Sequence, residues 1–291
     1  MTTGMDVKIL KRLEEWEGKE GSLPKTFEVY RRLLNIQAEA RARAGVPSLS
    51  LSDEAITNRL MNGSPILRFD DLSLDWALLW KVFGEVVGVC ASYPEILDEV
   101  PENLEDSDSC RAHLKEATKA WYEGSQLSPQ LSIGGLHGAL LEFIIQAVLR
   151  PFLLSHSEAL ISRVDQEHWR RGYCPICGGS PDFAVLENES GGRWLLCSRC
   201  DAQWLFQRLE CPYCGTQEMN ALNYFTDDEG LYRLYVCERC RHYLKAIDLR
   251  RANYEVLLPL ERYLTLDLDL QANKDKYIPG VEIRQGDEVR R

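Results

Sequence analysis

The sequence predicts an α+β protein with a mainly α-helical N-terminal domain followed by two tandem zinc-ribbon modules. In the first 170 residues, apolar positions recur at spacings of three and four, which is typical of amphipathic helices. Four Cys-x-x-Cys pairs then follow between Cys174 and Cys240, among short aromatic runs and glycines. We therefore expect a helical domain over 1–168, ribbons over 169–208 and 209–252, and a C-terminal segment with a polar tail over 253–291.

Four helices are expected in the N-terminal half. The first runs from Pro24 to Gly45, and the second follows Asp75 and stops near Tyr93. A third helix ends at Tyr122, after a cap at Asp108 or Ser109.

The fourth expected helix begins at Leu136, after two glycines, with a kink at Pro151 because proline cannot donate a backbone hydrogen bond. The ribbon region contains short strand-like segments beside the cysteine pairs, at residues 183–186, 193–196, 221–225 and 231–236. Residues 265–270, a threonine followed by alternating Leu and Asp, fit either a strand or a short helix.

Composition narrows the class of protein. With 45% apolar residues, the chain is typical of a soluble globular protein, and its net charge of -11 argues against a general nucleic-acid surface.

Residues 1–20 show no signal peptide. The most apolar run, 140–154, is broken by Glu142 and Arg150, so we expect no membrane insertion. We expect a cytoplasmic protein, in which ten cysteines serve as metal ligands, buried residues or catalytic groups rather than disulfides.

The cysteine pairs form an internal repeat. Cys-Pro-Ile-Cys-Gly from Cys174 resembles Cys-Pro-Tyr-Cys-Gly from Cys211, and each is followed by a second pair with Arg before its last cysteine. This repeat favours sequential over interleaved pairing. The predicted metal ligands are Cys174, Cys177, Cys197 and Cys200 in site one, and Cys211, Cys214, Cys237 and Cys240 in site two.

Two Cys-x-x-Cys turns aim four sulfurs at one point, and such a tetrahedral set accepts zinc or a single iron. Cys177 and Cys197 are separated by 19 residues, within the usual range, whereas 22 residues separate Cys214 and Cys237, as a longer hairpin allows. A ribbon of about 30 residues has too small a core to fold alone, so the metal is expected to stabilise it. Because four cysteines leave no open coordination position, we expect a structural role and no enzymatic activity.

Two other functions fit parts of this pattern. Cys211-Pro-Tyr-Cys214 is also a dithiol motif of glutaredoxin-like enzymes, so a thiol-redox or sulfur-handling activity at an exposed pair is the alternative. Those enzymes need a helix after the motif, which Gly215 disfavours. Nucleic-acid binding would need a basic ribbon region, yet residues 167–251 carry 11 Lys/Arg against 12 Asp/Glu.

The remaining candidate residues are assigned structural roles. Cys90 lies on the apolar side of a helix, and Cys110 lies near a helix cap. His242 adjoins Cys240, where four cysteines already complete the site. Structural roles are also assigned to His137, His156 and His168.

The segment Trp-Arg-Arg-Gly-Tyr-Cys-Pro-Ile-Cys-Gly from Trp169, followed by three further pairs after a helical half, resembles the formate dehydrogenase accessory protein family, the FdhE type. Residues 23–32 and 264–268 are also similar to that family. The resemblance covers roughly residues 20–270 and is most specific over 169–240.

This resemblance implies a cytoplasmic maturation factor, or chaperone, that binds the catalytic subunit of a molybdenum- or tungsten-containing formate dehydrogenase before its export or assembly. It also implies rubredoxin-like sites that bind iron. In contrast to rubredoxin, the second pair of each site is followed by Asp201 or Arg241 and lacks Pro and Gly. We therefore expect two metal ions, iron or zinc, each in a site of four cysteines, with no nucleic-acid partner.

Overall fold

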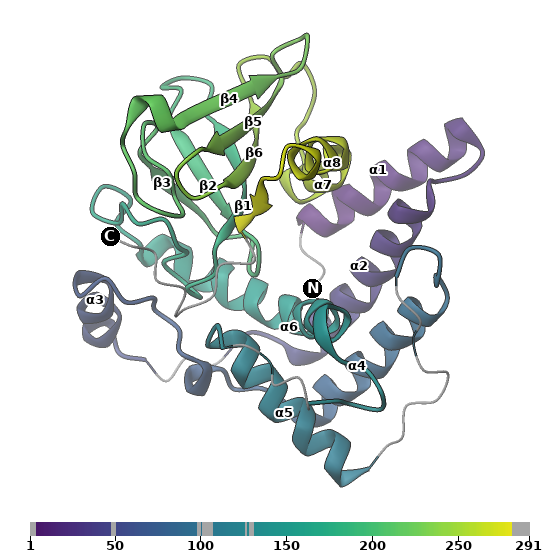
Figure 1. Cartoon of the computed structure of the whole chain (residues 1–291). Helices are drawn as coiled ribbons and strands as arrows, with labels where there is room; N and C mark the ends of the chain where they lie inside the picture. The colour runs from purple at the N-terminus through teal and green to yellow at the C-terminus, as the bar shows by residue number, and fades with distance from the viewer. Residues whose placement is uncertain are drawn as a thin grey trace. The chain divides into compact units, whose positions relative to one another are not determined.

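The computed structural model describes residues 4–47, 51–97, 100, 107–125, 127 and 131–280. The chain forms two compact units, one of Met1–Leu49 with Phe69–Ser155 and the other of Ser50–Arg68 with His156–Arg291. Figure 1 shows helices throughout the first unit and the sheet in the second.

The first unit is helical, as predicted. Its elements are α1 (Gly4–Glu20), α2 (Lys25–Ala44), the short 3-10 helix η1 (Phe69–Asp71), α4 (Trp76–Ala91), α5 (Asp108–Tyr122) and most of α6 (Gly138–Leu160). Helix α2 packs against α1 and α4, and α4 also packs against α5.

Side-chain caps define two of the helix starts. The Asp75 carboxylate accepts hydrogen bonds from the amides of Ala77 and Leu78, as the sequence predicts for α4. Helix α5 is capped by Ser107 rather than by Asp108 or Ser109, because its hydroxyl accepts from the Cys110 amide.

The start of α6 lies two residues after the predicted Leu136. Gly134 and Gly135 have positive φ angles of 59° and 90° and form a turn closed by a bridge between Ile133 and Leu136. The helix then begins at Gly138 and continues through Pro151.

Buried polar contacts connect helices inside the first unit. Gln37 on α2 donates to the Ala147 carbonyl on α6 at 2.9 Å and accepts from Arg150 at 3.0 Å. Arg41, also on α2, donates to Ser155 and to the Asp6 carboxylate. These pairings satisfy polar groups that would otherwise be costly to bury.

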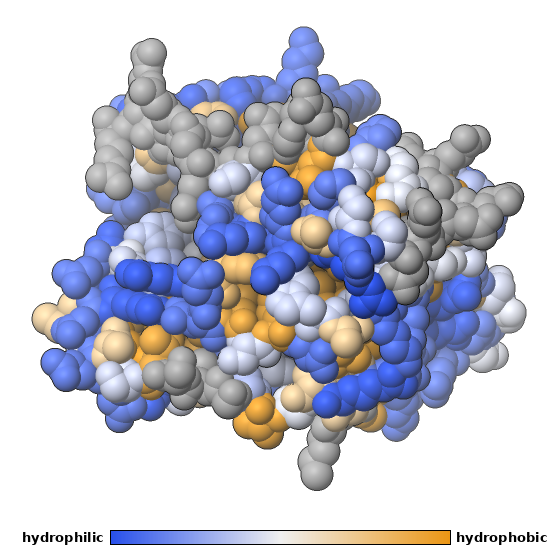
Figure 2. All heavy atoms as spheres, turned by 90° about the horizontal axis from the view of Figure 1, so that it is seen from below, coloured by the Kyte–Doolittle hydropathy of each residue, from blue (hydrophilic) through white to orange (hydrophobic). Residues whose placement is uncertain are grey.

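The stretch Gly138–Arg163 is long and apolar enough to cross a membrane by length and composition, while 56% of its most apolar window is buried inside the structure. A core helix of a soluble protein has the same properties. On the face drawn in Figure 2, hydrophilic side chains surround separate hydrophobic areas.

The second unit contains α3 (Asp53–Met61), the 3-10 helices η2 (Ile161–Arg163) and η3 (Met219–Ala221), and a seven-stranded sheet. The strands are β1 (Pro181–Leu186), β2 (Arg193–Cys197), β3 (Gln203–Phe206), β4 (Leu222–Thr226), β5 (Tyr232–Cys237), β6 (His242–Asp248) and β7 (Ile278–Pro279). The chain ends, within the described residues, with α7 (Leu258–Leu264), α8 (Leu266–Lys274) and β7.

The sheet is made of two antiparallel three-stranded halves in the order β3-β2-β1-β6-β5-β4, with β7 beside β6. The halves join through parallel pairing of β1 with β6, with Phe183 opposite Lys245 and Leu186 opposite Asp248. The backbones also approach closely at Gly172, where a Cβ atom would lie 1.8 Å from the Pro212 carbonyl oxygen. The two copies of the repeat are thus parts of one continuous sheet.

One face of the second half of the sheet packs against the C-terminal helices. Leu234, Val236 and Tyr243 form a buried cluster with Ala272 of α8 and with Tyr277. Residues 265–270 therefore lie mostly in a helix, and Tyr243 and Lys245 bond the carboxylate of Asp269. Residues 281–291 of the predicted polar tail lie outside the described residues.

Candidate metal centres

The four Cys-x-x-Cys turns lie at equivalent places in the two halves of the sheet. In each half, one turn precedes the first strand, and the other begins at the last residue of the second strand, Cys197 of β2 or Cys237 of β5. The structure brings the cysteines together as two groups: Cys174, Cys177, Cys197 and Cys200, and Cys211, Cys214, Cys237 and Cys240. These are the sequential groups that the repeat predicts.

The sulfur positions fit a tetrahedral metal site. In the first group, Sγ of Cys177 lies 3.5 Å from Sγ of both Cys197 and Cys200. In the second group, the Cys211–Cys240 and Cys214–Cys237 sulfur distances are both 3.7 Å. A tetrahedron with metal–sulfur bonds of about 2.3 Å has edges of about 3.8 Å.

The electrostatics of the first group also fit a cation. Burial raises the pKa of the Cys174 and Cys200 thiols, so burying four thiolates together requires a positive counter-charge. Backbone amides add hydrogen bonds, from Ile176 to Sγ of Cys174 and from Arg199 to Sγ of Cys197, both at 3.4 Å. Each group could hold one metal ion, and zinc and iron suit the same four sulfurs.

The residue after each second cysteine adopts the left-handed backbone conformation. Gly178 and Gly215 have φ angles of 74° and 69°, and the equivalent Asp201 and Arg241 have 54° and 61°. In each turn, the amide of this residue donates to the carbonyl of the first cysteine. The closing turns therefore have the same geometry as the opening turns without glycine.

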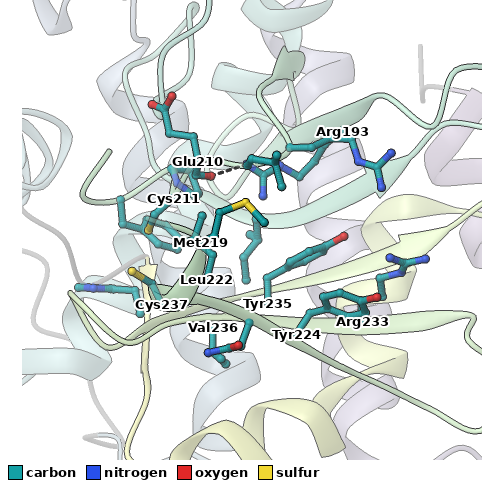
Figure 3. Close-up of a pocket in the computed structure, with 17 residues that line it drawn as sticks. Arg193, Glu210, Cys211, Met219, Leu222, Tyr224, Arg233, Tyr235, Val236 and Cys237 are labelled. Carbon is teal, nitrogen blue, oxygen red and sulfur yellow. Dashed lines mark hydrogen bonds between the residues drawn. The ribbon is translucent and has the colours of Figure 1, made fainter. Parts of the chain in front are cut away.

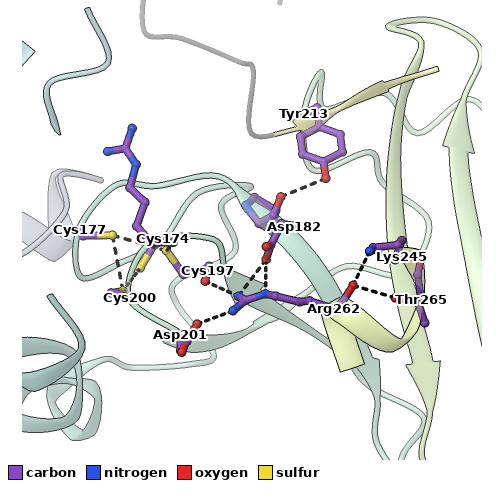
Figure 4. A network of polar contacts seen from close by, with 12 residues as sticks. Cys174, Cys177, Asp182, Cys197, Cys200, Asp201, Tyr213, Lys245, Arg262 and Thr265 are labelled. Carbon is purple, nitrogen blue, oxygen red and sulfur yellow. Dashed lines mark hydrogen bonds and ion pairs between the residues drawn. The ribbon is translucent and has the colours of Figure 1, made fainter. Parts of the chain in front are cut away.

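Arg262 of α7 holds the closing turn of site one. Its guanidinium donates to the Asp182 and Asp201 carboxylates at 3.0 and 2.6 Å, and to the carbonyl oxygen of Cys197 at 2.6 Å (Figure 4). The Arg262 carbonyl in turn accepts from Nζ of Lys245 at 2.9 Å. Thus a helix about 60 residues later in the sequence positions a cysteine of site one.

A different set of contacts holds the closing turn of site two. Arg241 bonds the Glu238 carboxylate, donates to the Asp275 carbonyl at 2.7 Å and lies 3.9 Å from the centroid of the Tyr277 ring. The Tyr277 hydroxyl also bonds Glu238. The C-terminal segment therefore supports both second turns.

The two groups differ in exposure. All four cysteines of site one are buried, whereas Cys214 and Cys240 of site two are partly exposed. Near site two, Nδ1 of His242 lies 2.9 Å from the Cys240 carbonyl oxygen, and its ring packs 5.2 Å from the Tyr213 ring. His242 is not in either four-sulfur group.

The Cys211–Cys214 pair does not have the setting of a glutaredoxin-like dithiol. Its sulfurs lie beside those of Cys237 and Cys240, and the chain continues through the short η3 into strand β4 rather than into a helix. The redox interpretation is therefore not favoured.

The other predicted structural residues lie outside these groups. Cys90 and Cys110 are buried in α4 and α5. His168 contacts the Asp165 carboxylate at 2.7 Å on the surface. Arg262 and Lys245 could not be identified from the sequence, because neither belongs to a cysteine motif.

Comparison with known proteins gives consistent results. Residues 173–208 match the family described as "FdhE, central domain". An FdhE homolog from Aquifex aeolicus is 29% identical over 235 residues, covering 79% of this chain and 77% of the relative. An FdhE homolog from Shewanella baltica OS223 is 28% identical over 263 residues, covering 87% and 80%.

The crystal structure of the FdhE protein from Pseudomonas aeruginosa has a similar fold. The TM-score is 0.57, with 20% sequence identity, and the match covers 96% of this chain and 94% of that chain. The likeness extends over both units.

Proposed function

We propose that the chain, which is similar to FdhE proteins over most of its length, is an accessory protein in the maturation of a formate dehydrogenase. In this proposal it binds the catalytic subunit of a molybdenum- or tungsten-containing enzyme before assembly or export, in the cytoplasm. The observation that carries the proposal is the match over more than three quarters of both chains, together with two four-sulfur groups in one sheet.

We propose that all eight cysteines are metal ligands and that the bound ions serve mainly to stabilise the sheet. Four sulfurs would complete each coordination shell and leave no position for a substrate. A structural zinc ion contributes roughly 10–16 kcal/mol of binding free energy, which suits ribbons with small cores. Binding of a partner, rather than catalysis, is the activity that this arrangement supports.

Copurification tests the partner. The tagged, metal-loaded chain is coexpressed with the catalytic subunit, and a molybdoenzyme subunit of another class is the matched control. We expect a complex with the formate dehydrogenase subunit alone, measured by size-exclusion chromatography with light scattering. The proposal fails if the two proteins elute separately under conditions in which both are folded.

Metal analysis of cysteine variants tests the ligands. We expect Cys174→Ser and Cys211→Ser each to reduce the metal content from about two ions to about one per chain, with a lower melting temperature. Cys110→Ser, outside both groups, is the control and should retain both ions. Visible absorption of the oxidised protein would identify iron, since zinc is colourless. Full metal content in Cys174→Ser would contradict the assignment.

A further inference from the structure

A pocket of about 260 Å³ lies beside site two, in the second unit. Its base is formed by residues of β4, β5 and β6, including Tyr224 and Tyr235, and its wall by Arg193 of β2 and residues 208–213 (Figure 3). Tyr224 and Tyr235 are paired across β4 and β5, so both side chains lie on one face of the sheet. The intervening Leu234 and Val236 belong to the buried cluster with α8 on the opposite face.

Apart from Cys211 and Cys237 of site two, the side chains that line the pocket carry more positive than negative charge, although the whole chain has a net charge of -11. Arg193, Arg208 and Arg233 line it, and Glu210 is the acidic residue among its lining residues. The Glu210 carboxylate accepts a hydrogen bond from Gln217 at 2.8 Å, and Figure 3 shows it pointing away from Arg193.

Arg193 is a buried cation with no carboxylate partner within the described part of the chain. Only 3% of the residue is exposed, and its guanidinium donates to the carbonyls of Gln207 and Glu210 while lying over the Tyr235 and Phe206 rings. Its Nε has no hydrogen-bond partner among the described residues. Burial lowers the Arg193 pKa to about 10, which still leaves the side chain charged at neutral pH.

Arg233 and Arg208 also have N–H groups without a hydrogen-bond acceptor among the described residues. Arg233 bonds Asp248, but that carboxylate is shared with Arg250, and the buried Nε of Arg233 is unpartnered among the described residues. Arg208 is exposed and has no ion pair or hydrogen bond within the described ranges. An occupant with a carboxylate would therefore find an exposed charge-assisted donor in Arg208, while the largely buried Arg193 and Arg233 add positive charge to the pocket lining.

The rim of the pocket is apolar and exposed to water. Leu209, Met219 and Tyr224 are 62%, 72% and 54% exposed, and all three line the pocket. Aromatic residues, methionine and arginine are the side chains most enriched in protein–protein interfaces. Burying these side chains against a partner would remove apolar surface from water.

We propose that this pocket binds a peptide segment of a partner protein that carries acidic side chains next to a large apolar one. The volume is smaller than the roughly 300–1,000 Å³ of small-molecule sites, so it suits individual side chains of a peptide. A polynucleotide is disfavoured because the chain as a whole is acidic and only Tyr224, of the three exposed rim residues named above, offers a ring for base stacking. This inference does not require that the partner be a formate dehydrogenase.

An array of blocked nonapeptides, in which acidic, basic, apolar and neutral polar positions vary independently, tests the proposal with the labelled, metal-loaded full chain. We expect retention of peptides that combine Asp or Glu with Leu, Ile or Phe. The affinity of the best peptide, measured by fluorescence anisotropy, should fall at least tenfold in Arg208→Glu and in Tyr224→Ser. Arg43→Glu, on an exposed arginine of the first unit, is the charge-matched control and should bind as the wild type does.

Metal content and melting temperature confirm that each variant is folded, and Arg208 has no described hydrogen bond to lose. Retention without preference for acidic peptides would overturn the proposal, as would wild-type affinity in both pocket variants. Tighter, Arg208-dependent binding of a 15-nucleotide oligo-dT would assign the pocket to nucleic acid instead. The array contains no formate dehydrogenase, so its result is independent of the copurification experiment.

Discussion

Asp201 and Arg241 occupy left-handed backbone positions that normally favour glycine, and each is anchored by its side chain. Gly178 and Gly215 reach the same conformation without such anchors. The sequence already showed that the second turns lack glycine, but it did not show that Arg262 and Asp275 compensate for this. The geometry of the two closing turns therefore depends on contacts with residues outside the motif.

Replacing Gly178 and Gly215 by alanine should separate the cost of backbone strain from the cost of a steric clash. Gly215 has open space around it, so we expect Gly215→Ala to lower the free energy of unfolding by about 1–2 kcal/mol, the cost of a left-handed residue. A Cβ at Gly178 would also lie 3.0 Å from Pro65, so Gly178→Ala should cost more. Urea unfolding of the metal-loaded proteins measures both, and equal effects would contradict this ranking.

The two cysteines outside the metal sites should be unreactive in the folded protein. Burial raises the Cys90 pKa to about 11, so only about one thiol in a thousand is ionised near pH 8, and the thiolate is the reactive form. Cys110 is buried as well. We expect less than one rapidly labelled thiol per metal-loaded chain with a maleimide, and ten after denaturation with a chelator. Rapid labelling of Cys90 without unfolding would contradict its burial.

Helix α7 and the start of α8 are attached to the sheet by buried charges. Arg262 bonds two carboxylates and a carbonyl, and Lys245 donates to the Arg262 carbonyl and to Asp269 at 2.6 Å (Figure 4). Because these charged groups are buried, removal of one partner leaves the opposite charge buried without a counter-charge. Helix α7 thus supports the closing turn of the first cysteine group, whereas residues after α8 support that of the second.

Arg262→Met should destabilise the second unit strongly. We expect a loss of about 3–5 kcal/mol in the free energy of unfolding, because Asp201 and Asp182 lose their cation. Arg262→Lys retains the charge but lacks the planar donor fork, so its loss should be intermediate. Urea unfolding at constant metal loading is the measurement. A change below about 1 kcal/mol for Arg262→Met would show that the network contributes little.

The elements that could be predicted from the sequence are those with local signals. Helix α4 follows from the spacing of the apolar residues after Asp75. The strands beside the cysteine pairs follow from short apolar runs bounded by turn residues. Strand β3 has only four residues, and the buried Lys245 in β6 interrupts an apolar pattern, so neither strand was predicted. Residues 265–270 alternate like a strand, but Asp267 and Asp269 lie in the first turn of a helix, where acidic residues are favoured.

The candidate metal sites were predictable because their spacing is local and repeated, whereas their supports were not. The parallel pairing of β1 with β6 and the contacts of Arg262 join residues far apart in the sequence. The periodic pattern of apolar residues in a sequence carries no information about such long-range contacts. The pocket beside site two escaped prediction for the same reason, since Arg193 and Tyr224 meet only in the folded sheet.

The molecule as a whole combines a helical unit, whose described core is built from apolar and polar side chains, with a sheet unit that contains both cysteine groups. Metal binding is therefore expected to stabilise the sheet unit more than the helical unit. The charge is also unevenly distributed, because an arginine-lined pocket lies in a chain with a net charge of -11.

Chelation of the intact protein should affect the sheet before the helices. After metal removal, we expect β1 to β6 to lose protection from hydrogen exchange, while α2 and α4 retain it, because metal binding stabilises only the fold that holds it. Mass spectrometry of peptic fragments measures this, and restoring zinc should restore protection. Simultaneous loss of protection in α2 and α4 would indicate that the units unfold as one.

The parallel pairing of β1 with β6 also sets an order of events during synthesis on the ribosome. Cys200 completes the first cysteine group early, but β1 cannot gain its second neighbour until Asp248 has been made. At about 5–20 residues per second, the roughly 60 residues from Leu186 to Asp248 take about 3–12 s to translate. During that interval the growing chain presents an unpaired strand edge, and the first group can take up its metal before the second exists.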